Sequence, residues 1–304
     1  MNKLTNVVSA WTRRVKNGQQ PNSDDLLDHL ANIHKSNAGF TESLAWNCRD
    51  AHGKNSYEIL ADMIDHRHHT NVLDLACGSG VLLDLCNQKF GNKLSYLGVD
   101  ISDAELELAR KRLAKTETKL TRCMAQNLQF IADYSINIIL CHWALTLMDP
   151  IIPVLDEVKR VLNAKGQFAA LVDGPMNTAP GYKEVHDLIY SYVQEEIPSY
   201  GDIDLGDPRI RGSESLSNLA QKTFPEANVT IETNVVSIKG PVIQVAKIAA
   251  GFFYAAFVLK PDKRKSMITS LSKILAISKE STNAERQGRF SMTISRLLVR
   301  PEIR

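Results

Sequence analysis

A short apolar run that ends in a glycine-rich turn is the feature that most constrains the fold of this chain. Residues 72–75 are apolar at three of four positions and predict a buried parallel strand. Gly78 and Gly80 follow, in a turn where no Cβ atom keeps a ligand from the backbone. The apolar segment 81–86 then predicts a helix whose first free N–H groups face that turn.

A second strand brings an acid to the same edge of the predicted sheet. Residues 94–99 form another apolar run, which ends on Asp100, twenty positions after Gly80. A carboxylate at this place can accept two hydrogen bonds from the diol of a ribose. Strand, glycine turn, helix, strand and acid together predict a site for a ligand that contains adenosine.

Two classes of adenosine ligand compete for such a site. The dinucleotide fingerprint requires a third glycine, but that position holds Leu83, and the fingerprint gives no reason for an acid before the turn. The alternative pattern is acid-x-Gly/Ala-x-Gly-x-Gly, which Asp74, Ala76, Gly78 and Gly80 fill. In that pattern the ligand has no pyrophosphate, and the first acid can hold a cationic ammonium group, often through water.

This stretch resembles the first motif of the class I S-adenosylmethionine-dependent methyltransferases, and Asp100 resembles their ribose-binding acid. The resemblance implies an α/β fold with a doubly wound, seven-stranded, mostly parallel sheet. It also implies S-adenosylmethionine as cofactor and S-adenosylhomocysteine as product. The cofactor-binding residues that it implies are Asp74, Ala76, Gly78, Gly80, Asp100, Ile101, Ala125, Gln126 and Cys141.

The resemblance extends over residues 71–173, with two departures. Residues 123–130 resemble the family segment whose acid and next backbone N–H read the adenine edge, but Met124 stands at the acid position. The N–H of Ala125 can still serve, and Gln126 could supply the lost acceptor. Asn137 stands where many relatives have an acid. Residues 160–167 resemble the family's turn into the fifth strand.

Strands and helices alternate through this block, as a doubly wound sheet requires. Further strands are expected at 120–124, 136–141 and 167–173, with a turn at 163–166 and helices at 102–115, capped by Ser102, and at 150–162. After the fifth strand we expect helices at 182–197 and 214–224, the latter capped by Ser213. The chain should end with strands at 229–238 and 290–299 and helices at 242–259 and 262–277.

We expect the segments before and after the first five strands to cover the site. Residues 1–66 form a helical N-terminal segment, in which Ser23 and Asp24 offer a helix N-cap, and residues 67–304 form the cofactor domain. Residues 176–225, between the fifth and sixth strands, contain a turn-rich loop and suit a substrate lid. Two alternatives stay open: the N-terminal helices only pack on the sheet, and the insertion is a surface elaboration.

Composition and charge argue against nucleic acid, a membrane and a metal as partners of this chain. A net charge of +2 gives no case for nucleic acid, and 242–259 reads as a buried helix rather than a membrane span. The five cysteines include no C-x-x-C pair, which fits a reducing cytosol and argues against zinc. Residues 1–20 lack an apolar signal core, and the histidines of 66–69 read as solvated rather than metal-binding. We expect a cytoplasmic protein without a metal; a homodimer is left open.

Candidate residues for methyl transfer follow the fourth and fifth strands. His142 is the candidate base or substrate-positioning donor, since its ordinary pKa suits neutral pH, although a wall role is an open alternative. Trp143 could stack on an aromatic or cationic substrate, and Asp173 is a second acceptor at the same edge. Trp46 and Tyr57 of the N-terminal segment complete the candidate substrate residues.

These observations predict an enzyme that methylates a small molecule, because the chain shows neither a basic groove nor an appended binding domain. Oxygen, nitrogen and carbon acceptors are not distinguished. Two alternatives are kept. One is a methyltransferase that acts on protein or RNA. The other is a protein that binds the cofactor or its demethylated product without catalysis, which the departures at Met124 and Asn137 keep open.

Overall fold

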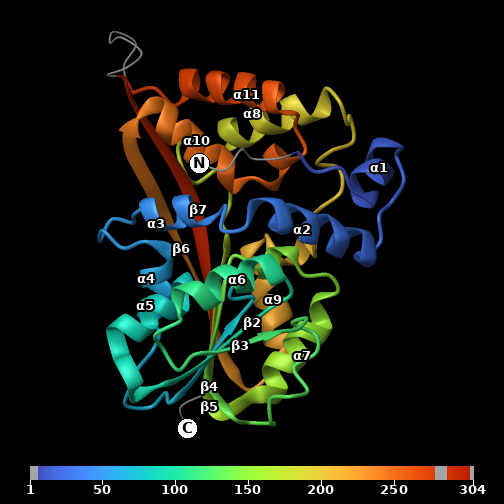
Figure 1. The fold of residues 1–304 in the computed structure, drawn as a ribbon. Coiled ribbons are helices and arrows are strands. Elements are labelled where there is room, and N and C mark those ends of the chain that lie inside the picture. Colours follow the sequence, from blue (N-terminus) through green and yellow to red (C-terminus); the bar gives the residue numbers. More distant parts are fainter. Residues whose placement is uncertain (1–5, 278–285, 302–304) are drawn as a thin grey trace. The chain divides into compact units, whose positions relative to one another are not determined.

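The computed structural model of the chain describes residues 6–277 and 286–301 (Figure 1). The chain divides into two compact units. The first contains the described residues within 1–55, 176–204 and 235–293, and the second those within 56–175, 205–234 and 294–304. Residues 1–5 of the predicted N-terminal cover lie outside the described residues, as do 278–285 and 302–304 of the predicted cofactor domain.

A seven-stranded sheet forms the framework of the second unit, and its strand order is β3-β2-β1-β4-β5-β7-β6. Its strands are β1 (Asn71–Leu75), β2 (Ser95–Asp100), β3 (Lys119–Arg122), β4 (Ile136–His142), β5 (Leu162–Asp173), β6 (Ala227–Pro241) and β7 (Gln287–Pro301). The first five pair in parallel, and β7 pairs antiparallel with β5. The predicted doubly wound, mostly parallel α/β sheet is therefore confirmed.

The strand order places the carboxyl ends of β1 and β4 side by side. Asp74 of β1 is paired with Gly98 of β2 on one side and with Leu140 of β4 on the other. The chain runs outward from β1 through β2 to β3 and then returns to β4 on the opposite side of β1. In open α/β sheets, ligands bind outside the carboxyl ends of the strands at such a reversal.

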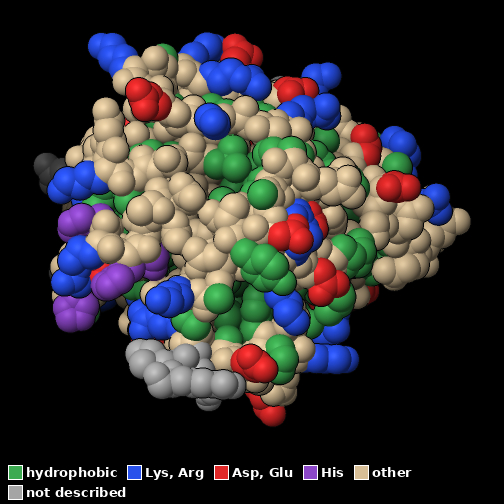
Figure 2. Space-filling model, turned by 90° about the horizontal axis from the view of Figure 1, so that it is seen from below, with side chains coloured by type: hydrophobic (Ala, Val, Ile, Leu, Met, Phe, Trp, Pro, Cys, Tyr) green, Lys and Arg blue, Asp and Glu red, His purple; other side chains and the backbone are tan. Residues whose placement is uncertain are grey.

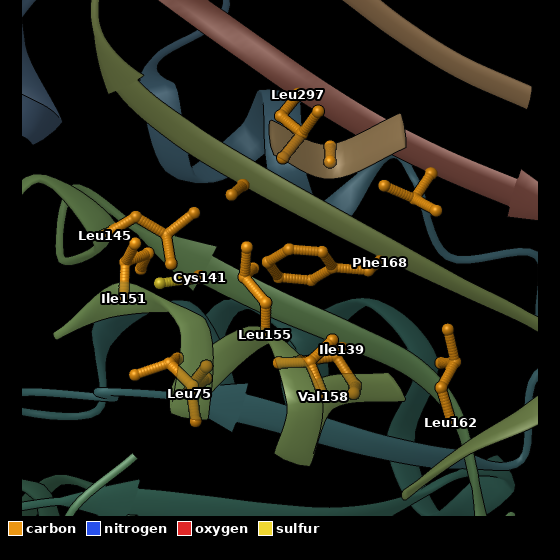
Figure 3. Close-up of a cluster of buried hydrophobic side chains, with 14 of the residues drawn as sticks. Leu75, Ile139, Cys141, Leu145, Ile151, Leu155, Val158, Leu162, Phe168 and Leu297 are labelled. Carbon is orange, nitrogen blue, oxygen red and sulfur yellow. The ribbon is translucent and has the colours of Figure 1, made fainter. Parts of the chain in front are cut away.

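A large apolar core lies on one face of this sheet (Figure 3). Phe168 of β5 and Ile139 of β4 face Leu155 and Val158 of helix α7 (Ile151–Val161), and all four side chains are at most 1% exposed. The opposite faces of β1, β4 and β5 are also buried, with apolar side chains except for the acid Asp74 on β1. A parallel sheet that is covered on both faces needs such continuous apolar strands, which is why the sequence pattern revealed them.

The other helices of the second unit connect or follow these strands. They are α4 (Ser56–Ala61), α5 (Val81–Phe90), α6 (Asp103–Arg112) and α9 (Ser213–Thr223), with short 3₁₀ turns η1 (Gly91–Lys93), η2 (Leu145–Leu147) and η3 (Pro208–Ile210). The predicted cap of α6 is confirmed, since the Ser102 hydroxyl accepts from the N–H of Glu105. The cap predicted for α9 was wrong: Gly212 precedes the helix, and the Ser215 hydroxyl donates to its carbonyl.

The predicted turn at 163–166 is an irregularity within β5 rather than a break before it. Leu162 pairs with Ile136, but the next pair joins Gln167 to Ile138. Five residues of β5 therefore face two of β4, so the additional residues bulge out of the ladder.

The first unit is largely helical. It contains α1 (Ala10–Lys16), α2 (Ser23–Asn37), α3 (Glu42–Asn47), α8 (Tyr182–Gln194), α10 (Val242–Phe252), η4 (Tyr254–Phe257) and α11 (Pro261–Ile274), with parts of β6 and β7. The N-cap of α2 is Asn22, not the predicted Ser23, because Asn22 and Asp25 form a reciprocal capping box. Among the described residues, no helix is both long and apolar enough to cross a membrane.

The single helix predicted for 242–259 was wrong in its length. α10 ends at Phe252, and Phe253 adopts an extended conformation before the 3₁₀ turn η4 begins. The ring of Phe253 lies against Tyr182 and His186 of α8, with centroids 6.3 and 6.2 Å apart. An apolar run cannot reveal such a break, since buried helix and buried 3₁₀ turn share the same composition.

Candidate cofactor and substrate site

The glycine turn, residues 76–80, reverses the chain sharply after β1. Ala76, Gly78 and Gly80 all have left-handed backbone conformations, with φ of 60°, 52° and 78°. Gly80 is the N-cap of α5, so the helix begins directly at the turn. The N-terminus of α5, with its free N–H groups and positive dipole end, therefore lies beside the carboxyl end of β1.

The two glycines of the predicted motif serve different purposes. A Cβ atom on Gly80 would lie 3.0 Å from Leu113 and 3.1 Å from Ala109, so glycine lets α6 pack closely against the turn. A Cβ on Gly78 would meet only Glu105 Oε2, at 3.9 Å. Gly78 therefore leaves room above the backbone, as a bound ligand requires.

Asp74 is a buried acid without a hydrogen-bond partner for its Oδ1 atom among the described residues. Burial, and secondly the charge of Asp100, raise the pKa of Asp74 to about 8. A buried carboxylate of this kind is stabilised by a cation. The orphaned oxygen fits the ammonium group that the resemblance assigns to it.

Asp100 ties three elements together at the end of β2. Its Oδ2 accepts from the N–H of Gly78 at 2.8 Å, and its Oδ1 accepts from the N–H of Ser102 at 2.8 Å. The carboxylate thereby fixes the glycine turn relative to the start of α6. Each carboxylate oxygen has two lone pairs, so Asp100 can accept further bonds from a ribose.

Arg112 is a residue of this site that the sequence analysis missed. Its Nη1 donates to the carbonyl of Ser79 at 2.6 Å and to the Ser79 hydroxyl at 2.9 Å. Arg112 is the last residue of α6, so a helix end holds the middle of the glycine turn. A partner 33 positions away along the chain leaves no local signal in the sequence.

The strand ends beside Asp100 expose apolar side chains. Ile101 is 37% and Met124 is 38% exposed, whereas Cys123 and Ala125 pack against the apolar core. The N–H of Cys123 donates to the carbonyl of Asp100 at 3.0 Å, which brings the two strand ends together. Gln126 follows in the same loop and is half-buried.

At the end of β4, His142 contacts the helix α4. Its Nε2 lies 2.9 Å from the hydroxyl of Ser56, and the ring of Tyr57 stacks on the imidazole with centroids 4.2 Å apart. Trp143 is buried at 7% exposure and has a left-handed φ of 55°. Cys141 is fully buried, and burial raises its thiol pKa to about 12, so this thiol is inert at neutral pH.

Burial lowers the pKa of His142 to about 3, so the imidazole is neutral at physiological pH. A group with such a pKa is a weak general base near neutrality. The roles predicted for His142, as a base, a substrate-positioning donor or a wall residue, stay predictions, and its contacts with Ser56 and Tyr57 fit a positioning role. Ser56, its hydrogen-bond partner, was not among the predicted site residues because it lies 86 positions away.

Asp173 lies at the end of β5 and pairs with Arg211. The Arg211 Nη1 donates to Asp173 Oδ2 at 3.2 Å, and its Nη2 donates to the carbonyl of Leu205 at 3.1 Å. Burial raises the pKa of Asp173, while the charge and hydrogen bond of Arg211 oppose that shift. Arg211 was also missed, for the same reason of distance along the chain.

The second unit thus brings together the predicted residues that follow its strand ends, with Tyr57 against His142. Trp46 belongs to the first unit, on α3, where its side chain is 45% exposed, so its substrate role stays a prediction.

In the segment 66–69, His66 and His68 are exposed and His69 is buried. Figure 2 shows histidines gathered at one edge of one face. Among the described residues, no group of three potential metal ligands converges.

A family described as "Methyltransferase domain" matches residues 72–166, the block that contains the glycine turn and the first four strands. The demethylmenaquinone methyltransferase of Listeria monocytogenes is 28% identical over 135 residues, which are 43% of this chain and 55% of that protein. The corresponding enzyme of Staphylococcus aureus is 26% identical over 167 residues, 55% of this chain and 65% of that protein.

Residues 72–166 therefore form a methyltransferase domain, and these matches support a class I S-adenosylmethionine-dependent methyltransferase.

Solved structures of low sequence identity share the methyltransferase fold. The YcgJ protein from Bacillus subtilis has a TM-score of 0.54 at 17% identity, covering 81% of this chain and 98% of that one. A phosphoethanolamine N-methyltransferase 2 from Haemonchus contortus has a TM-score of 0.52 at 14% identity, covering 93% of this chain and 61% of that one. The chain spans about half the length of the curated relatives that it matches first, 55% for the first of them.

S-adenosylmethionine is the cofactor of this methyltransferase class, and the residues present fit it: an orphaned buried acid, an open glycine and a carboxylate at the second strand.

The departure at Asn137 has a structural explanation. Its Oδ1 accepts from the N–H groups of Thr70 and Asn71 and from the Thr70 hydroxyl. Asn137 therefore fastens β4 to the start of β1, at the edge of the sheet opposite the glycine turn.

Proposed function

We propose that this methyltransferase transfers a methyl group from S-adenosylmethionine to a small-molecule acceptor. The observation that carries the proposal is the meeting of Asp74, the glycine turn and Asp100 at the reversal of strand order. This arrangement offers a buried acid, an open backbone and a sugar-binding acid to one nucleoside. The departures from the family pattern lie outside these three features.

The cofactor side of the site is assigned to residues around β1 and β2. Asp74 holds the ammonium group, Gly78 allows the backbone to approach the methionyl portion, and Asp100 accepts from the ribose. Ile101, Ala125 and Gln126 contact the adenine of the cofactor, and Cys141 contributes to the buried apolar side of the site. When bound, S-adenosylmethionine supplies an electrophilic methyl group whose leaving sulfur departs neutral, so these residues need provide no acid.

The acceptor side is assigned to residues at the ends of β4 and β5. Neutral His142, held by Ser56 and Tyr57, presents a fixed wall that orients the acceptor. Orientation of the two reactants is the main contribution that such an in-line displacement requires, up to about 10 kcal/mol in favourable cases. Asp173 accepts the proton or hydrogen bond of an acceptor hydroxyl or amine, and its raised pKa suits that exchange.

A small acceptor is supported by two observations. The demethylmenaquinone methyltransferases, by their names, act on demethylmenaquinone, a small molecule. On the face shown in Figure 2, basic and acidic side chains are interspersed, without the single-sign field that a polyanion would favour. Both support a metabolite over protein or RNA as the acceptor.

The test is incubation of the full chain with methyl-labelled S-adenosylmethionine and a metabolite extract, followed by separation by mass. The proposal predicts that label enters a low-mass fraction and that Asp100→Ala lowers this transfer when the cofactor is limiting. Label in protein or RNA would make the chain a macromolecule methyltransferase. Cofactor binding without any transfer would make it a binding protein.

A further inference from the structure

Residues 205–211, the part of the predicted lid insertion that contains η3, are fastened to the chain that follows β4. They belong to the second unit, as do β4 and β5. The two backbones approach so closely that a Cβ atom on Gly206 would overlap the carbonyl oxygen of Thr146. The N–H of Asp207 donates to the carbonyl of Met148 at 3.3 Å. The segment is therefore held against the η2 turn by its own backbone.

Side chains also brace this segment from within. Asp207 is buried, and its carboxylate accepts from the N–H of Arg209 at 3.0 Å and from the Arg209 Nε at 2.9 Å. Arg211 closes η3, because its N–H donates to the carbonyl of Pro208 at 3.2 Å. Its Nη2 donates to the carbonyl of Leu205, so the side chain of Arg211 spans the segment. The braced backbone leaves the guanidinium little freedom of position.

Arg211 presents its other terminal nitrogen to Asp173 at the end of β5. The Arg211 Nη1 donates to Asp173 Oδ2 at 3.2 Å. Because a guanidinium is planar, bonds to the two oxygens of Leu205 and Asp173 set its orientation. The Asp173 side chain keeps 23% of its surface exposed and the Arg211 side chain 35%, so a ligand can reach the pair. A partly exposed ion pair contributes little to stability, which leaves the orientation of the carboxylate as its larger effect.

The charge of Arg211 also bears on the protonation of Asp173. Burial raises the pKa of Asp173, and the charge and hydrogen bond of Arg211 act against that rise. Without the guanidinium, the carboxyl group would experience burial alone and would keep its proton to a higher pH. A carboxyl group that already carries its proton cannot take one from a substrate.

We propose that Arg211 is a positioning residue, which keeps Asp173 ionised and oriented so that its carboxylate takes the proton of the methyl acceptor. The proposal rests on the proposed function, since it takes the acceptor to lie at the ends of β4 and β5. In the transfer, the acceptor atom bonds to the methyl carbon and the carbon–sulfur bond breaks, with its electron pair remaining on sulfur. The proton of the acceptor atom passes to an oxygen of Asp173. Arg211 exchanges no proton and acts only through Asp173.

The first experiment titrates Asp173 by NMR of protein in which the aspartate carboxyl carbons carry ¹³C, with Asp173→Asn to assign the resonance. Arg211→Gln should raise the pKa of Asp173 by at least about one unit, because a neighbouring opposite charge lowers the pKa of an aspartate by about one to three units. Arg211→Lys keeps the charge and should restore most of that difference. This titration needs neither cofactor nor acceptor.

Arg209→Gln is the matched control, because Arg209 lies in the same segment and pairs with Asp207 instead. This variant should leave the pKa of Asp173 unchanged. Thermal unfolding verifies that each variant is folded, and Arg211→Met replaces Arg211→Gln if the latter is not.

The second experiment follows transfer of label from S-adenosylmethionine into the low-mass fraction of the metabolite extract across a range of pH. Arg211→Gln should move the acid limb of this pH profile upward by about the shift that NMR measures. Calorimetry should show an affinity for S-adenosylhomocysteine that is unchanged within about twofold. An arginine with only a structural role would lower transfer at all pH values alike.

An unchanged pKa of Asp173 in folded Arg211→Gln would overturn the inference. A shifted pKa with an unchanged pH profile would overturn it as well, because Asp173 would then not take the proton. If the natural chain binds S-adenosylhomocysteine but transfers no methyl group, the proposed function fails instead. The NMR titration still decides in that case whether Arg211 keeps Asp173 ionised.

Discussion

Asp100 is a structural residue as well as a candidate ligand. Its carboxylate accepts from the N–H groups of Gly78 and Ser102, so it shapes the turn before any nucleoside arrives. Removing it should therefore cost both stability and affinity. This dual role distinguishes Asp100 from a side chain that merely faces the ligand.

Asp100→Ala should weaken binding of S-adenosylhomocysteine by about 1.5–3 kcal/mol, the scale of a lost hydrogen bond to a charged group. Calorimetry measures the affinity, and thermal unfolding reports the loosening of the turn. Asp103→Ala is the control, because Asp103 lies close by but its side chain is 71% exposed. Unchanged affinity in a folded Asp100→Ala protein would remove Asp100 from the site.

Asp74 should make stability depend on pH. Its pKa is raised from 3.8 to about 8 in the folded protein, so the folded state keeps a proton that the unfolded chain releases. The unfolding free energy therefore falls as pH rises through that interval. Urea unfolding at pH 5 and pH 8.5 should show a fall that Asp74→Asn reduces by at least about 1.4 kcal/mol, the equivalent of one pKa unit. Equal falls in both proteins would contradict this assignment.

The residues predicted from the sequence are those whose role follows from local spacing. Asp74 and Asp100 could be found because each closes a strand whose apolar pattern is visible in the sequence. Arg112, Ser56 and Arg211 could not, since their partners lie 33, 86 and 38 positions away. The lowered pKa of His142 was equally out of reach, because it arises from burial that only the fold creates.

At the scale of elements, the glycine turn depends on the packing of α6. Gly80→Ala should destabilise the fold by about 1–3 kcal/mol, because φ is 78° and the added methyl would press on Leu113 and Ala109. Gly240→Ala should change stability little, since its Cβ would meet only Val245, at 3.9 Å, and its φ is not left-handed. Denaturant unfolding measures both variants, and equal stabilities would refute this reading of the turn.

His142 lies at the contact between α4 and β4, and its replacement tests whether it positions the acceptor. If His142 positions the acceptor, His142→Ala should lower turnover by about tenfold to a hundredfold with little change in cofactor affinity. The pH dependence of turnover should keep its shape, because a histidine with a pKa of about 3 does not titrate near neutrality. Loss of a titration step near pH 6–7 in the variant would instead make His142 the base.

Periodicity predicted the elements better than their ends. The apolar runs of β1 and β4 and the cap at Ser102 were predicted correctly, because burial and capping act locally. The bulge in β5 and the end of α10 at Phe252 were not, since both arise from packing against distant residues. Apolar composition indicates that a segment is buried but not where its regular structure stops.

At the scale of the whole molecule, three separate segments join in each compact unit. The predicted N-terminal cover and lid insertion both contribute to the first unit, and residues 205–225 of the insertion belong to the second. The sequence could not predict which segments belong to which unit, because that assignment depends on contacts between distant parts of the chain rather than on any local pattern. The covering and lid roles, the cytoplasmic location and a homodimer stay predictions.

The central claim is that the glycine turn after Asp74 receives the methionyl end of S-adenosylmethionine while Asp100 binds its ribose. A crystal structure of the full chain with S-adenosylhomocysteine tests this most directly. The account predicts electron density for the nucleoside along residues 74–80, with the ribose hydroxyls on Asp100 and the ammonium group beside Asp74. Density for the nucleoside elsewhere, or a pyrophosphate ligand at the turn, would contradict it.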